Sequence, residues 1–162
     1  MVTVRDATTD DLDALMALRA EVAAEGRWIG AELPLDEEGD RASLVTAVED
    51  RDAALFVADA DGVVVGLLFI RLPRYLVAEL GMLVSAGWRR RGVGSNLLEA
   101  GLDWARSHGA HKVALQHWPH NHAAHALYRK YGFEQEGYLR RHYPRKDGEL
   151  WDAVVMGLLL DD

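Results

Sequence analysis

The stretch from residue 78 to residue 106 reads AELGMLVSAGWRRRGVGSNLLEAGLDWAR, and it predicts the centre of the fold. An apolar run from Leu80 to Val84 is followed by three arginines and then by Gly92 and Gly94. Apolar residues then recur at helical spacing, on a face formed by Val93, Leu97, Leu98, Leu102 and Ala105. The stretch therefore predicts a strand, a glycine-rich turn and a helix.

A turn of this kind is suited to binding phosphate. The first N–H groups of a helix have no partner within the helix, and they lie at the positive end of its dipole. Gly92 and Gly94 have no Cβ that would keep a diphosphate from the backbone, while Arg89, Arg90 and Arg91 add positive charge at the rim. Glycine turns also occur where no ligand binds, so this stretch alone leaves both interpretations open. Its spacing matches neither a P-loop nor a dinucleotide-binding fingerprint.

The segments before this stretch predict a strand, two helices and a loop. Residues 2–5 alternate like a strand, and Thr8 or Thr9 offers an N-cap for a helix with an inner face of Leu12, Leu15, Met16 and Val22. Residues 25–40 lose periodicity and predict a loop. A second helix is expected to start at Asp40 or Ser43, with an inner side of Leu44, Val45 and Val48.

The remaining segments predict a mixed sheet. Residues 54–58 and 63–70 flank Asp61-Gly62 and predict an antiparallel hairpin. The central strand is expected to begin at Tyr75, a fifth strand to span residues 112–117, and two final strands to span residues 133–139 and 150–160. A strand, helix and strand in succession requires a parallel pair, whereas the hairpins are antiparallel. We therefore expect an α/β fold with helices on both faces of a mixed sheet.

Composition limits the classes of function. The 162 residues fit one domain spanning residues 1–162. Eighteen basic and 26 acidic residues give a net charge of −8, which argues against nucleic acid or an anionic membrane as a partner. The chain has no cysteine, so it has no disulfide, no thiolate zinc site and no cysteine nucleophile. The apolar segment 153–160 is too short to span a bilayer, and we expect a cytoplasmic protein.

Two ordered motifs resemble those of the GNAT superfamily of N-acetyltransferases. Arg89-x-x-Gly92-x-Gly94 is similar to its pyrophosphate loop, and residues 121–133, NHAAHALYRKYGF, are similar to its late helix. The resemblance covers residues 2–160 and implies a GNAT fold, with a mixed, mostly antiparallel sheet whose central and fifth strands splay apart. It also implies acetyl-CoA as acetyl donor, an amine acceptor, no metal and, because members are often dimers, a homodimer.

The resemblance implies which residues contact the coenzyme. Backbone groups near Leu83 and Val84 are expected to pair with the pantetheine amides, and the N–H groups of residues 91–95 to hold the diphosphate. For Asn121, a contact with the coenzyme and a local N-cap are both open. The full expected set is Leu83, Val84, Arg89, Arg90, Arg91, Gly92, Val93, Gly94, Ser95, Asn121 and Tyr128.

Two residues are candidates for the chemistry. Tyr128 matches the family tyrosine near the coenzyme sulfur, and a phenol with an ordinary pKa of about 10 can donate a proton to a thiolate. A tyrosine packed under the sheet is the competing interpretation. Glu79 resembles the carboxylate with which several members take the ammonium proton, directly or through water. Alternatively, Glu79 is a solvated or salt-bridged acid on the strand, or the base is only an ordered water, as in some family members.

The acceptor site is expected around Trp28, Glu79, Trp118 and Tyr143. Trp28 either packs on the core or forms a wall of this pocket. Residues 140–146 are expected to form a basic loop resembling the acceptor-lining segment of the family. It could bind an acceptor carboxylate or the ribose phosphate of the coenzyme, with a solvated loop as the favoured interpretation. Four histidines lie at positions 117, 120, 122 and 125, and His122 and His125 could share a helix face. No nearby acid follows a known ligand spacing, so we expect no metal, with a histidine metal site as the weaker alternative. His117 or His120 is an alternative base.

The sequence thus predicts direct acetyl transfer from acetyl-CoA to a primary amine, on a small amine, an amino acid or a protein N-terminus. A domain that binds acyl-CoA without turnover, as a sensor or scaffold, is the alternative.

Overall fold

A computed structural model describes residues 1–160 of the chain. The helices are α1 (Leu12–Glu25), α2 (Glu37–Glu49), α3 (Val93–Ser107) and α4 (His122–Lys130). The strands are β1 (Val2–Asp6), β2 (Ala53–Ala60), β3 (Val63–Arg71), β4 (Val77–Val84), β5 (Lys112–His117), β6 (Glu134–Pro144) and β7 (Leu150–Leu159). Short 3-10 turns are η1 (Thr9–Asp11), η2 (Arg74–Leu76) and η3 (Ala86–Trp88).

The strands form one sheet in the order β1-β2-β3-β4-β5-β7-β6. Its neighbouring strands are antiparallel except β4 and β5, which are parallel. A parallel pair needs a crossover, and α3 provides it. The predicted mixed, mostly antiparallel sheet is confirmed.

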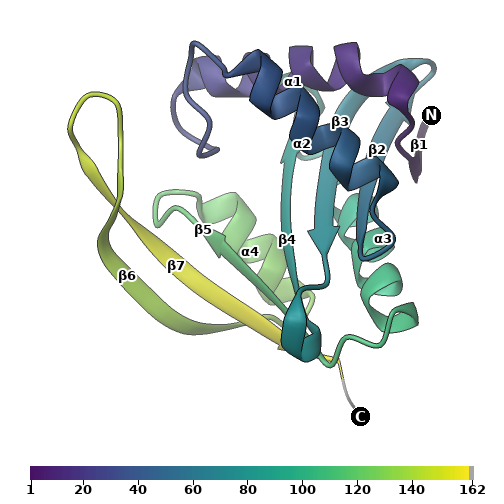
Figure 1. Ribbon diagram of the computed structural model, residues 1–162. Helices are drawn as coiled ribbons and strands as arrows, with labels where there is room; N and C mark the ends of the chain where they lie inside the picture. Colours follow the sequence, from purple (N-terminus) through teal and green to yellow (C-terminus); the bar gives the residue numbers. More distant parts are fainter. Residues whose placement is uncertain (161–162) are drawn as a thin grey trace.

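The parallel pair splays apart along its length. Pairing between β4 and β5 extends only from Val77 opposite Lys112 to Glu79 opposite Ala114, although both strands continue beyond it. Figure 1 shows the two strands meeting at the bottom of the view and diverging upward. This confirms the predicted splay, and it leaves the upper half of β4 without a strand partner on its β5 side.

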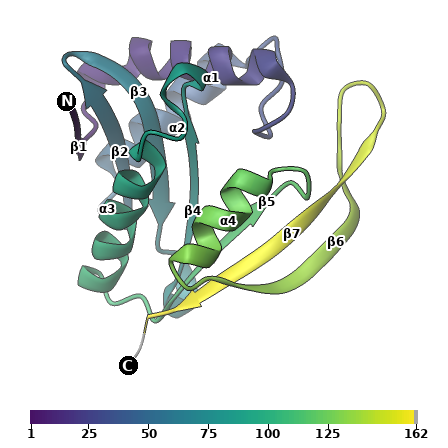
Figure 2. The same ribbon diagram turned by 180° about the vertical axis from the view of Figure 1, so that it is seen from behind.

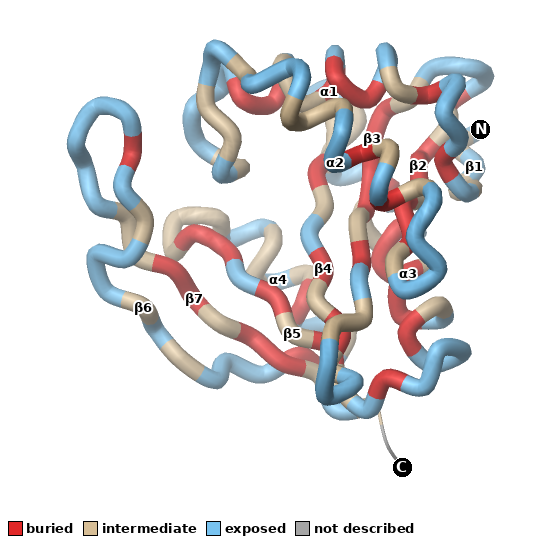
Figure 3. Tube along the Cα trace, in the orientation of Figure 1, coloured by how far each residue is buried: buried red, intermediate tan, exposed pale blue. Residues whose placement is uncertain are grey.

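Helices cover both faces of the sheet. One apolar cluster packs α1 and α2 on one face, with Leu15, Val22 and Leu44 against Val57 and Leu67. The second cluster includes the inner face of α3 together with Val113, Phe133 and Met156. The helices α3 and α4 lie on this other face, seen from behind in Figure 2, and buried residues in Figure 3 follow the strands and inner helix faces. No helix within residues 1–160 is long and apolar enough to cross a membrane.

Most predicted elements are present, with corrections at three ends. The Asp61-Gly62 hairpin and the strand at residues 112–117 are confirmed. The predicted start of the second helix is wrong: α2 begins at Glu37, because Asp36 accepts a hydrogen bond from the Gly39 N–H at 3.1 Å and caps it. The central strand begins at Val77, after η2, and not at Tyr75. β6 extends to Pro144, so residues 140–144 belong to a strand and not to a loop.

Candidate functional site

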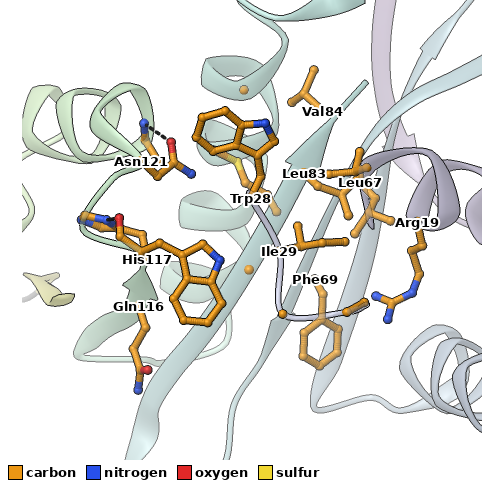
Figure 4. Close-up of a pocket in the computed structure, with 18 of the residues that line it drawn as sticks. Arg19, Trp28, Ile29, Leu67, Phe69, Leu83, Val84, Gln116, His117 and Asn121 are labelled. Carbon is orange, nitrogen blue, oxygen red and sulfur yellow. Dashed lines mark hydrogen bonds between the residues drawn. The ribbon is translucent and has the colours of Figure 1, made fainter. Parts of the chain in front are cut away.

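A cavity of about 1050 Å³ opens where β4 and β5 separate. Residues from both faces of the sheet line it, because the splay removes the hydrogen bonds that would close the gap. Figure 4 shows Gln116, His117 and Asn121 on the β5 side, facing Leu67, Phe69 and Arg19 across the opening. Of the predicted site residues, the cavity is lined by Trp28, Leu83, Val84, Arg89, Arg90, Gly92, Gly94, Ser95, Trp118, Asn121, Tyr128 and Tyr143.

The glycine turn lies at one end of this cavity. Gly92 has a φ of +83° and is the N-cap of α3, a left-handed conformation that glycine adopts without strain. The Asn96 N–H donates a hydrogen bond to the Gly92 carbonyl at 3.1 Å, and this bond closes the first turn of α3. The N–H groups of residues 93–95 have no backbone partner within residues 1–160, and they are the donors that a helix N-terminus offers to an anion. A side chain at Gly94 would press on Leu127, at 3.3 Å from the added Cβ.

The three arginines of the turn have different environments. Arg89 forms a double ion pair with the Glu25 carboxylate at 2.8 and 2.7 Å and donates from Nε to the Val84 carbonyl at 3.0 Å. This partner keeps the pKa of Glu25 below its ordinary value, although burial acts in the opposite direction. Arg91 lies over the Trp88 ring, 4.2 Å from its centroid, and is not among the residues that line the cavity. Arg90 lines the cavity and is exposed.

The free edge of β4 provides backbone groups to the cavity. Leu83 and Val84 pair with Leu67 and Gly66 of β3 on one side and have no β5 partner on the other within residues 1–160. Gly81 and Met82 line the cavity with them. An unpaired strand edge of this kind can hydrogen-bond an extended, amide-containing ligand.

Tyr128 lies beneath the cavity on α4. Its side chain is buried, and burial raises the pKa of Tyr128 to about 12, so the phenol keeps its proton at neutral pH. The ring packs between Phe133 and His117, with centroid distances of 5.6 and 6.2 Å. Asn121 caps the same helix, accepting from the Ala124 N–H at 3.2 Å, and it also lines the cavity. Both roles considered for Asn121 are therefore compatible with its position.

Glu79 is not brought to the cavity. Its carboxylate pairs with Arg71 of the neighbouring strand at 2.9 Å, its side chain is 44% exposed, and it is not among the lining residues. This is the salt-bridged environment that the sequence left as an alternative. A role for Glu79 as base stays a prediction without a supporting contact.

Aromatic side chains surround the acceptor side. Trp118 makes edge-on contacts with Tyr143 at 5.4 Å and with Trp151 at 5.1 Å between ring centroids. The Tyr143 hydroxyl donates to the Gln116 side chain, which also lines the cavity. Trp28 both packs on the α1–α2 core and lines the cavity, so its two interpretations do not exclude each other.

Arg145 and Lys146, between β6 and β7, hold the α1–α2 loop, and we call these two residues the clamp. The predicted solvated loop is wrong for Arg145. The Arg145 side chain is 5% exposed and lies over Trp151 and Trp118, 4.1 and 5.3 Å from their centroids. Its NH1 donates to the Gly30 carbonyl at 3.3 Å, and its Nε lies 3.5 Å from the Glu32 carboxylate. Lys146 adds contacts to carbonyls of residues 32–34. The β6–β7 end is thereby joined to the α1–α2 loop.

The histidines do not form a metal cluster. Within residues 1–160, no group of three or more His, Cys, Asp or Glu side chains is arranged to hold a metal ion. His117 Nδ1 lies 2.8 Å from the Trp118 carbonyl and Nε2 lies 3.0 Å from Nδ1 of His125. Because a carbonyl can only accept, Nδ1 carries the proton and both nitrogens of His117 are occupied. His120 Nε2 lies 2.6 Å from the Arg27 carbonyl.

Arg19, Phe69 and Gln116 are among the cavity residues that sequence reasoning missed. A signal existed for two of them. Arg19 is a charged residue on the predicted inner face of α1, four positions after Leu15 and three before Val22. Gln116 is a polar residue that directly follows the apolar run VAL of the predicted strand. Phe69 has no such signal, because an aromatic residue in a strand is ordinary.

Comparisons with known proteins agree with this geometry. The sequence model described as the acetyltransferase (GNAT) family matches residues 15–133. An aminoglycoside N(6')-acetyltransferase type 1 of Stenotrophomonas maltophilia is 34% identical, over 82% of this chain and 86% of its own. The L-amino acid N-acetyltransferase AaaT of Escherichia coli is 30% identical, over 96% of each chain. The solved ribosomal-protein-alanine N-acetyltransferase of Brucella melitensis superposes with a TM-score of 0.88 at 29% identity, covering 98% of this chain and 99% of that one.

The structure thus combines a splayed parallel pair, a glycine turn at a helix N-terminus and a buried tyrosine beneath the gap. A family match over most of the chain accompanies them. The chain belongs to the GNAT family of acetyltransferases and is an N-acetyltransferase.

Proposed function

We propose that the chain transfers acetyl from acetyl-CoA directly to the primary amine of a small molecule. The observation that carries the choice of acceptor is the clamp over the acceptor side. Arg145 and Lys146 hold the α1–α2 loop through the Gly30 carbonyl, Glu32 and the carbonyls that follow. A peptide substrate needs a groove through which its chain can leave, and this joined pair of loops favours a compact acceptor.

Acetyl-CoA fits the other half of the cavity. The diphosphate would lie against the N–H groups at the start of α3, with Arg90 at the rim. The pantetheine amides would pair with the free edge at Leu83 and Val84, which leads the thioester toward Tyr128.

The reaction needs no covalent enzyme intermediate. The neutral amine attacks the thioester carbonyl carbon, a C–N bond forms and the C–S bond breaks. Tyr128 donates its proton to the leaving thiolate, and the phenolate recovers a proton from the nitrogen that has become cationic on attack. The raised pKa of Tyr128 keeps this proton available throughout the neutral range. The acceptor ammonium loses its first proton to water, since both His117 nitrogens are engaged and Glu79 is paired with Arg71.

The test combines thermal unfolding with acetyl-CoA and thiol release with amines. A ligand that binds only the folded state at a hundredfold excess over its dissociation constant stabilises it by about 2.7 kcal/mol. We expect this upward shift, with CoA thiol released by small primary amines and not by peptides of six residues. Faster release with the peptides would overturn the choice of acceptor. A shift without release by any amine would indicate a binding module instead of an enzyme.

A further inference from the structure

We infer that the acceptor carries a carboxylate and that Arg19 of α1 binds it. This inference rests on the proposed function and narrows its substrate to amino acids and similar amino carboxylates. The observations that carry it are the position of Arg19, the state of its guanidinium and the balance of charge in the cavity.

Arg19 lies where a helix normally presents apolar residues. Leu15 and Val22, one turn away on either side, are buried in the core between α1 and the sheet. The Arg19 side chain is 26% exposed and lines the cavity beside Ile29 and Phe69. Figure 4 shows it across the opening from Gln116 and His117. The guanidinium is thus on the α1 side of the space that an acceptor would fill.

The guanidinium of Arg19 has unused hydrogen-bonding capacity. Its hydrogen bond to a side chain is a long one, from NH2 to the Asp40 carboxylate at 3.4 Å. Its Nε is buried and has no partner within residues 1–160. A guanidinium offers five N–H donors in a planar fork that matches a carboxylate. Arg89, by comparison, uses its fork fully on Glu25 at 2.8 and 2.7 Å.

The cavity is cationic although the chain has a net charge of −8. Among residues 1–160, the charged side chains that line it are three arginines, at positions 19, 89 and 90, and one acid, Asp40. Arg89 is held by Glu25 through two close contacts and Arg90 lies at the glycine turn, whereas Arg19 pairs with Asp40 through a single contact at 3.4 Å and keeps donors for the acceptor. Leu55, Leu67 and Phe69 form an apolar wall beside it. A polycationic acceptor would meet this arginine unfavourably, whereas an apolar amino acid matches both the wall and the charge.

The experiment compares acceptors that differ only in the carboxylate. L-phenylalanine, L-leucine and L-methionine would each be assayed against the corresponding carboxamide and decarboxylated amine, by thiol release at saturating acetyl-CoA. We expect wild-type kcat/KM to be at least tenfold higher for the acids. Arg19→Gln should lower kcat/KM for the acids about tenfold or more, corresponding to about 1.4 kcal/mol, and leave the amides and amines within threefold. Arg19→Lys should retain part of the preference because it keeps the charge but loses the fork.

Arg41→Gln is the matched control. Arg41 is an arginine on α2 that pairs with Asp13 and does not line the cavity, so its removal should leave every acceptor unchanged. An equal thermal shift with acetyl-CoA in all variants would show that Arg19→Gln is folded and binds the donor.

The outcomes separate the two claims. If wild type acetylates amines without preferring the acids, or if Arg19→Gln slows acids and amines equally, the role of Arg19 is refuted and the proposed function stands. If no small amine releases thiol, the proposed function fails and this inference fails with it.

Discussion

Arg89 and Glu25 form a double ion pair, at 2.8 and 2.7 Å, that joins the glycine turn to the last residue of α1. A carboxylate at a helix C-terminus is unfavourable beside the helix dipole, and Arg89 compensates it. The same arginine donates to the Val84 carbonyl at the free edge of β4. Arg89 therefore fixes the two backbone segments that are expected to bind the coenzyme, and it does so without its fork being free for phosphate.

Replacing Arg89 should weaken acetyl-CoA binding more than replacing Arg91. We expect Arg89→Gln to raise the dissociation constant about tenfold, or about 1.4 kcal/mol, because it releases the turn and leaves the Glu25 charge near the diphosphate. Arg91→Gln should change it less than threefold, since Arg91 lies over Trp88. Isothermal titration would measure both. The Glu25→Gln, Arg89→Gln double variant should recover part of the loss, and a larger loss in the double variant would contradict this account.

Tyr128→Phe should lower kcat roughly 10²- to 10⁴-fold, the range for loss of a positioned general acid, with little change in the KM for acetyl-CoA. Because the pKa of Tyr128 is raised to about 12, wild-type kcat should show no loss near pH 10 from ionisation of this phenol. Tyr131→Phe is the control: Tyr131 bonds Glu99 at 3.1 Å and does not line the cavity. A rate within threefold of wild type for Tyr128→Phe would refute the acid assignment.

Glu79→Gln should leave kcat within about threefold of wild type, because the carboxylate pairs with Arg71 and does not line the cavity. Arg71→Gln, which removes the partner instead, should behave in the same way. Steady-state rates across pH 6 to 9 would check both. A hundredfold loss of kcat in Glu79→Gln but not in Arg71→Gln, with a shift in the acidic side of the pH–rate profile, would restore Glu79 as the base acting through water.

Arg145→Ala should reduce the free energy of unfolding by roughly 2 to 4 kcal/mol, because it leaves Glu32 and two carbonyls without their buried partner. It should also raise the KM for the acceptor, since the α1–α2 loop is no longer held. Urea denaturation and acceptor kinetics would measure the two effects. Arg140→Ala, at an exposed position of β6, should change stability by about 0.5 kcal/mol or less. Equal losses in the two variants would argue against the clamp.

The stability of the fold should decrease as the pH falls below about 6.5, the ordinary pKa of histidine. Burial lowers the pKa of His117 in the folded chain, and the nearby His125 and His122 lower it further. Between the two pKa values the unfolded chain binds more protons, so stability is complete above the unfolded pKa and is lost below it. Urea titrations from pH 5 to 8 should show this slope in wild type and in His111→Gln, an exposed control, but a shallower one in His117→Gln. An unchanged slope in His117→Gln would assign the effect to other groups.

Local patterns were sufficient for the elements that place the coenzyme. The helical spacing from Val93 to Ala105, the Asp61-Gly62 turn and the Asn121 cap each involve residues within a few positions of one another. Such signals act on the backbone directly, through burial of one helix face, tolerance of positive φ and capping of N–H groups. The resemblance to the GNAT superfamily rested on the same short segments, and the family match confirms it.

The roles of individual charged residues could not be predicted in this way. Nothing in the sequence around Glu79 and Glu25 distinguishes the roles of their carboxylates. Glu79 pairs with Arg71 of the neighbouring strand, whereas Glu25 holds Arg89 at the cavity. Arg145 looked like a solvated cation, but it is buried against two tryptophans and bonds to Ile29, 116 positions earlier. Long side chains take their partners from whichever elements the fold brings near, and that choice depends on contacts far apart in the chain.

The sequence by itself thus determined the strand, turn and helix at the coenzyme end and the order of the elements around them, because these depend on local periodicity and backbone preference. Only the tertiary structure decided the acceptor end. The clamp at Arg145 and the position of Arg19 on the cavity wall arise where segments far apart in the chain meet. Burial and ion pairing at such a meeting point are set by the packed fold and leave no pattern within any one segment.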